Sequence, residues 1–109
     1  MERKPKGEVI PIGRTWLRDL EVTDEILDKL WSKHRVVLDE VIECLLGYTL
    51  RRAKPGDDRR LYVYGRSRGG RYLFVVLERL APRSFFLLSA RGMVTGERRK
   101  YGQTLKKDP

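Results

Sequence analysis

The chain has 109 residues, with 24 Lys and Arg against 15 Asp and Glu and a net charge of +9 at neutral pH, which is enough for one basic domain with a modest core. No apolar run approaches the roughly 18 residues of a membrane helix, and the N-terminus lacks the pattern of a secretory signal. A single cysteine and a single histidine exclude a disulfide framework and a multi-histidine metal site, so we expect a cytoplasmic protein without metal or cofactor.

Residues 1–20 are predicted to be a partly flexible tail, because Pro5, Pro11 and Gly13 interrupt regular structure. Within this tail, residues 9–12 can dock as a short extended segment.

Two helices are predicted next. Thr23 is a good N-cap, and the apolar side chains that follow it recur at helical spacing: Ile26, Leu27, Leu30, Trp31 and His34. A second helix is predicted to open at Asp39 and to end at Gly47, because glycine suits a helix C-cap.

The remainder of the chain is predicted to be mainly strands. Apolar or alternating segments are found at residues 48–53, 61–65, 72–77 and 85–90. Short turns join them, which favours antiparallel pairing. A last short helix follows Thr95. We therefore expect an α+β domain over residues 21–103, in which an antiparallel sheet of three to four strands packs against two N-terminal helices, with a basic tail at residues 104–109.

The positive charge is concentrated in the C-terminal half. Residues 48–109 carry 16 basic and 5 acidic side chains, whereas residues 21–47 carry 3 basic and 7 acidic ones. Such a field attracts phosphate backbones or an acidic protein. Arg outnumbers Lys by 16 to 8, which favours nucleic acid because a guanidinium makes two-point phosphate contacts and stacks on bases. A thermostable protein with many surface ion pairs is the alternative.

Four arginines flank the predicted strands: Arg66, Arg68, Arg71 and Arg91. In an antiparallel meander, a hairpin and a strand end can meet at one edge of the sheet. Guanidinium groups gathered there repel one another unless an anion or carboxylates intervene, so a phosphate site is one interpretation. A solvated rim paired with Glu78 or with the acidic helices is the other.

Tyrosines are interleaved with these arginines, at Tyr62, Tyr64, Tyr72 and Tyr101. Aromatic rings beside arginines suit unpaired RNA bases. Ordinary packing within the sheet explains the same residues.

His34 is the one side chain that ordinarily titrates near neutral pH. It ends the apolar stripe of the first helix, where it is either a packed histidine at a helix C-terminus or a general acid or base beside a phosphate. Cys44 lies on the apolar side of the second helix and is expected to be a small buried residue.

Several segments, taken in order, resemble one known family. Residues 33–36, Lys-His-Arg-Val, and residues 39–41 are similar to its KHGV…EEV stretch. Residues 61–73 are similar to its GRS…GR hairpin, and residues 89–101 to its SAR…ERR.Y ending. The resemblance, to the BrnT-like toxins of type II toxin–antitoxin modules, spans about residues 21–101. Arg35 stands where the family has glycine, and residues 1–20 differ from the family's opening.

The resemblance implies a RelE-like fold and a metal-independent endoribonuclease that directs a ribose 2′-hydroxyl at the adjacent phosphate. It also implies inhibition by an acidic, DNA-binding antitoxin similar to BrnA. Arg66 and Arg91 are then assigned to phosphate and transition-state charge, because arginine is a poor base, and His34 to proton transfer. The residues expected to contact substrate are Arg68, Arg71, Arg98, Arg99 and Tyr101.

Two other functions are compatible with the sequence. A non-catalytic RNA-binding or regulatory protein explains the charge equally well and needs no proton-transfer group. A protein-interaction domain whose basic surface meets only an acidic partner is the third hypothesis.

Overall fold

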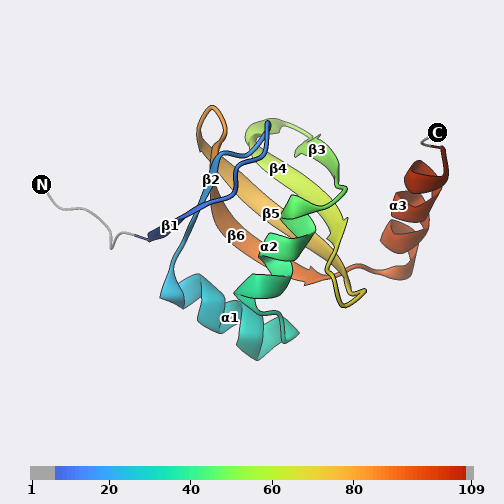
Figure 1. Ribbon diagram of the computed structural model, residues 1–109, viewed down its shortest axis with the longest axis horizontal. Coiled ribbons are helices and arrows are strands. Elements are labelled where there is room, and N and C mark those ends of the chain that lie inside the picture. Colours follow the sequence, from blue (N-terminus) through green and yellow to red (C-terminus); the bar gives the residue numbers. More distant parts are fainter. Residues whose placement is uncertain (1–6, 108–109) are drawn as a thin grey trace, which may run out of the picture.

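A computed structural model describes residues 7–107, with side chains described through Thr104. It is an α+β domain built on a six-stranded mixed sheet with three helices (Figure 1). The strand order is β1-β2-β6-β5-β4-β3. The strands are β1 (Glu8–Pro11), β2 (Asp19–Val22), β3 (Leu50–Lys54), β4 (Asp57–Arg66), β5 (Tyr72–Ala81) and β6 (Ser84–Gly92).

The predicted sheet was wrong in its size and in the direction of one pairing. Strands β3 to β6 form the expected antiparallel meander, but β1 and β2 extend the sheet to six strands. Strand β2 pairs in parallel with β6, with Leu20 opposite Phe85. Residues 7–20, expected to be a tail, thus hold one whole strand and the start of a second. The helices therefore follow two strands, so the expected RelE-like arrangement of two N-terminal helices on a three- to four-stranded sheet is not the fold of this chain.

Helix α1 (Asp24–His34) begins at a side-chain cap and ends at a residue in the left-handed conformation. The Thr23 Oγ1 accepts a hydrogen bond from the N–H of Ile26 at 3.3 Å. At the other end Arg35 adopts the left-handed conformation, with φ of 53°, and its N–H donates to the carbonyl of Trp31. This terminating geometry is usually supplied by glycine, since a side chain there is strained.

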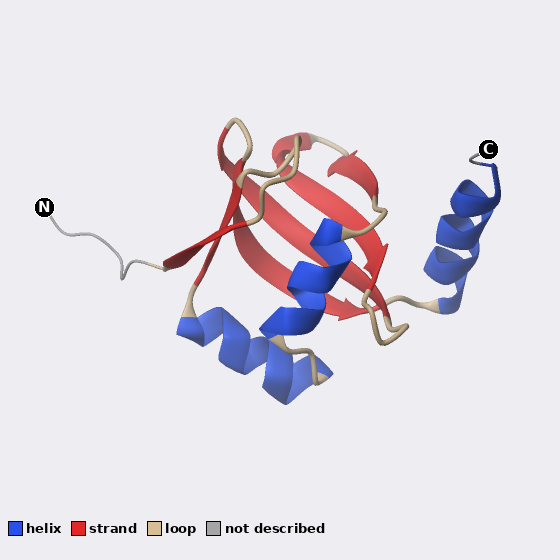
Figure 2. Ribbon diagram, viewed as in Figure 1, coloured by secondary structure: helices blue, strands red, loops and turns tan. Residues whose placement is uncertain are grey.

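Helices α1 and α2 (Leu38–Leu46) cover one face of the sheet (Figure 2). Strand side chains alternate between two faces, so every second residue of the central strands packs against these helices. Among the buried side chains are Leu30 and Leu45 from the helices and Val63, Val75 and Leu87 from the strands. This single core leaves the other side chains of the same strands on the opposite face.

Helix α3 (Thr95–Lys107) stands apart from the other two and joins the end of β6 through a short link (Figure 1). It is longer than the short helix expected, so residues 104–107 of the expected tail are helical, and residues 108–109 lie outside the described residues. Tyr101 anchors it: the side chain is 2% exposed, and its hydroxyl donates to the Tyr48 carbonyl at 3.0 Å.

Candidate nucleic-acid interface

The face of the sheet opposite α1 and α2 carries a row of partly exposed aromatic rings. They come from alternate positions of two paired strands: Tyr62 and Tyr64 of β4, and Tyr72 and Phe74 of β5. The ring of Phe74 lies 5.2 Å from that of Tyr62 and 5.0 Å from that of Tyr64, measured between centroids. We call the surface formed by these four residues the aromatic face.

Three guanidinium groups lie over these rings. The Cζ atom of Arg91 is 4.4 Å from the centroid of Phe74. Those of Arg66 and Arg98 are 5.0 and 4.6 Å from the centroid of Tyr72, so one ring carries two cations. The three arginines come from β4, β6 and α3, and the fold gathers them on a surface that combines flat apolar groups with positive charge.

The three arginines differ in their acidic partners. Arg91 forms a two-point ion pair with Glu97, with both nitrogen–oxygen distances at 3.0 Å. Burial alone would raise the pKa of Glu97, but hydrogen bonds from Arg91 and the Val94 N–H, with the Arg91 charge, lower it below its usual value. Within the described part of the chain, Arg66 and Arg98 have no carboxylate partner. Their charge is therefore available to an anion.

A groove of about 340 Å³ opens between α3 and strands β3 and β4, at the end of the aromatic row. Leu50 and Tyr64 contribute to its lining from the sheet, Val94 from the link before α3, and Gly96 from the first turn of α3. The charged side chains that line it are Arg52, Glu97 and Lys100. Since Tyr64 belongs both to the groove and to the row of rings, the two surfaces are continuous.

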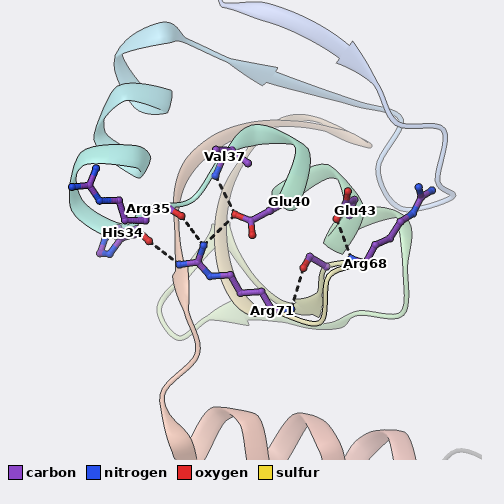
Figure 3. Close-up of polar contacts among 8 residues, drawn as sticks. His34, Arg35, Val37, Glu40, Glu43, Arg68 and Arg71 are labelled. Atoms are coloured by element: carbon purple, nitrogen blue, oxygen red, sulfur yellow. Dashed lines mark hydrogen bonds and ion pairs between the residues drawn. The ribbon is translucent and has the colours of Figure 1, made fainter.

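Arg71, which was expected to contact substrate, performs a structural task on the helical side (Figure 3). Its Nη1 donates to the Arg35 carbonyl at 2.6 Å and to the Glu40 Oε1 at 3.2 Å, and its Nη2 donates to the His34 carbonyl at 2.8 Å. One side chain thus binds the C-terminus of α1 to the first turn of α2. Its charge is compensated by groups of the protein itself.

His34 lies at the end of α1, in the helical layer and away from the three stacked arginines. Its imidazole points away from Arg71 (Figure 3). The structure therefore brings Arg66 and Arg91 to one face, and leaves the histidine assigned to proton transfer on the other.

The remaining predicted substrate residues are dispersed. Arg68 is exposed in the β4–β5 hairpin, where its backbone N–H donates to Glu43 at 3.0 Å. Arg99 is exposed on α3. Tyr101 packs between Tyr48 and Tyr72, with ring centroids 5.9 and 6.0 Å away, and serves to hold α3 against the sheet.

Two members of this surface, Phe74 and Arg52, were missed by sequence reasoning, and Lys100 was not among the residues expected to contact substrate. Phe74 lies in a segment that is apolar on both faces, which hid its outward position, although its spacing of two from Tyr72 was a usable signal. Arg52 is paired opposite Tyr62 across β3 and β4, a register that only the folded sheet defines.

Cys44 is fully buried, as its place on the apolar side of the second helix predicted. Burial, with the charges of Glu40 and Glu43, raises the pKa of its thiol to about 12. A thiol held neutral in this way is a packing group.

Residues 7–107 contain no group of three or more His, Cys, Asp or Glu residues placed to hold a metal ion, and none of their helices is long and apolar enough to cross a bilayer. No protein-family model matches the chain, and no curated protein is significantly similar to it.

Proposed function

We propose that the protein binds single-stranded RNA across the aromatic face. The observation that carries this proposal is the row of four partly exposed rings with three guanidinium groups over them. Unpaired bases stack on aromatic side chains, and arginines contact the phosphates between them. A duplex hides its bases in the helix, so this surface favours a single strand.

The first test measures binding of a fluorescein-labelled single-stranded RNA by anisotropy at several salt concentrations. We expect the logarithm of the affinity to fall with the logarithm of salt by roughly 0.7 for each phosphate contact. Replacing Phe74 by Leu should weaken binding roughly 5- to 100-fold, because one stacked base is lost. The matched control is Trp31→Leu, which removes a ring that is 50% exposed on the helical side.

The second test asks whether RNA binding depends on where an arginine lies or only on the total positive charge. Arg66 and Arg35 are both exposed arginines whose guanidinium lies 5.0 Å from an aromatic ring, Arg66 on the aromatic face and Arg35 at the C-terminal cap of α1. We expect Arg66→Gln to weaken RNA binding about tenfold more than Arg35→Gln. Equal effects from the two variants, or no RNA binding by the parent protein, would contradict the proposal.

An RNA-cleaving function is the second candidate, as the resemblance to BrnT-like toxins implies. One feature favours it: Arg66 and Arg98, without a carboxylate partner among the described residues, are suited to the charge of a phosphate in its transition state. We expect labelled RNA to acquire cyclic-phosphate ends on incubation, and expression in bacteria to arrest growth. Arg66→Ala or Arg91→Ala should relieve the arrest, whereas His34→Ala should not, because His34 lies in the helical layer on the other side of the sheet. Intact RNA after prolonged incubation would leave binding as the function.

A toxin would also require an inhibitor. The partner expected from the resemblance is an acidic, DNA-binding antitoxin, which a basic surface of this kind would attract. A small neighbouring gene encoding such a protein, and loss of RNA binding when the two are mixed, would support the toxin function.

A further inference from the structure

We propose that the groove between α3 and strands β3 and β4 binds one unstacked nucleotide of the RNA, whose base carries an exocyclic amino group. The inference rests on the proposed RNA-binding function and deepens it. Stacking and phosphate contacts do not distinguish one base from another, whereas a site in the groove would.

The dimensions and lining of the groove fit such an occupant. Its volume of about 340 Å³ lies within the range of small-ligand pockets. Tyr64 offers a ring on which a base can stack, and Leu50 and Val94 supply apolar contact. A strand that lies across Phe74 and Tyr64 reaches the groove directly, because Tyr64 is 5.0 Å from Phe74 between ring centroids.

Charge complementarity identifies the occupant as a nucleotide. Arg52 and Lys100 line the groove from opposite elements, β3 and α3, and neither forms an ion pair within the described part of the chain. A phosphate attached to a base in the groove would meet both cations. An apolar peptide segment would leave them without a partner.

Glu97 supplies the preference for an amino group. Its Oε1 accepts from Arg91 Nη1 and from the Val94 N–H, each at 3.0 Å, so both lone pairs of that oxygen are engaged. Its Oε2 accepts only from Arg91 Nη2 among the described residues. A lone pair therefore remains for a donor in the groove. The amino group of cytosine provides that donor, whereas the corresponding carbonyl of uracil would face a carboxylate.

The test uses two free nucleotides that differ at this one group, CMP and UMP, titrated into ¹⁵N-labelled protein and followed by NMR. We expect CMP to shift the amide signals of Leu50, Gly96 and Lys100 in a saturable manner, and to bind about tenfold more tightly than UMP, the value of one hydrogen bond to a charged group. UMP binding as tightly as CMP, or shifts elsewhere only, would overturn the inference. If the groove signals shift when the protein is diluted and do not respond to nucleotide, the groove is occupied by a second copy of the chain. That result would also overturn the inference.

A pair of glycine substitutions in α3 supplies the matched control. A Cβ atom added at Gly96, which lines the groove, or at Gly102, which does not, meets no atom within 4 Å. We expect the ring of Gly96→Phe to occupy the groove, to abolish the CMP shifts, and to weaken binding of oligocytidine roughly 5- to 100-fold. Gly102→Phe should do neither, and circular dichroism should show both variants folded.

The two proposals fail in distinguishable ways. If the parent protein binds oligocytidine and Gly96→Phe binds it equally well, the groove inference is overturned and RNA binding stands. If CMP binds in the groove but no RNA binds, the function is overturned and the groove site stands.

Discussion

Arginine side chains take two different roles in this protein, and their immediate neighbours decide which. Arg71 donates to two carbonyls and to a carboxylate of the protein itself. Arg66 and Arg98 have an aromatic ring as their neighbour. A ring attracts a cation without neutralising it, so these guanidinium groups keep both charge and donors for a ligand.

The structural role of Arg71 can be tested by removing its side chain. We expect Arg71→Ala to lower the free energy of unfolding by about 2 kcal/mol, because the carbonyls of His34 and Arg35 lose a charged donor. Urea titration measures the change. Arg68→Ala in the same hairpin should change stability by less than about 0.5 kcal/mol, and an equal loss in both variants would contradict the assignment.

The left-handed residue at the end of α1 leads to a second expectation. Arg35→Gly should raise the free energy of unfolding by about 0.5 kcal/mol, because glycine adopts φ of 53° without strain. Arg35→Ala should lower it, since the strain remains and the contact of Arg35 with the Trp31 ring, 5.0 Å from the guanidinium, is lost. Thermal unfolding of the parent protein and the two variants gives their order of stability. A higher stability of Arg35→Ala than of the parent would contradict strain at Arg35 as the cause.

At the scale of the elements, α3 determines the shape of the candidate site. It supplies Arg98 to the Tyr72 ring and one wall of the groove. Two contacts fix it, the buried Tyr101 and the ion pair between Glu97 and Arg91. Loss of either contact should change RNA binding as well as stability, because both depend on how α3 meets the sheet.

The ion pair makes the attachment of α3 sensitive to acid. The folded-state pKa of Glu97 lies below its unfolded value, so its contribution to stability is complete above the unfolded pKa and is lost as the pH falls through the folded one. We expect the parent protein to be more stable than Glu97→Gln by about 1 kcal/mol at pH 7. That difference should shrink below about pH 4.5, as chemical denaturation between pH 7 and pH 3 would show. A stability difference that stays constant down to pH 3 would show that it does not come from the ionised carboxylate of Glu97.

For the molecule as a whole, the parallel pairing of β2 with β6 joins the N-terminal segment to the core. It places Leu20 beside Phe85, with Leu20 completely buried. The same pairing covers an edge of β6 that would otherwise expose unpaired backbone groups. Residues 7–22 are thus part of the domain.

Replacing Leu20 by a smaller side chain tests whether the N-terminal segment contributes to the core. We expect Leu20→Ala to lower the free energy of unfolding by about 2–5 kcal/mol, the usual loss for a buried leucine. Val9→Ala on β1 should have little effect, because Val9 is 58% exposed. Denaturant titration distinguishes the two. A small effect at Leu20 would mean that the N-terminal segment contributes little to the core.

Elements with a strong local signal were predicted well. The cap at Thr23 and the apolar stripe after it identified α1, and the alternating or apolar segments located β3 to β6. Strand β2 was missed, and β1 was expected only as a short extended segment over residues 9–12, because each has four residues and little periodicity. Their stability comes from pairing with distant strands, which leaves no local pattern to detect.

For the candidate site, the sequence by itself determined the ingredients: a basic C-terminal half rich in arginine, with tyrosines interleaved. Only the tertiary structure decided which arginines are free to bind a ligand. Arg71 and Arg66 have the same charge and lie five positions apart, yet Arg71 donates to carbonyls at the end of α1 and Arg66 stacks on Tyr72. The alternation of a strand sends its side chains to opposite faces, and what packs on each face is determined by segments far away in the chain.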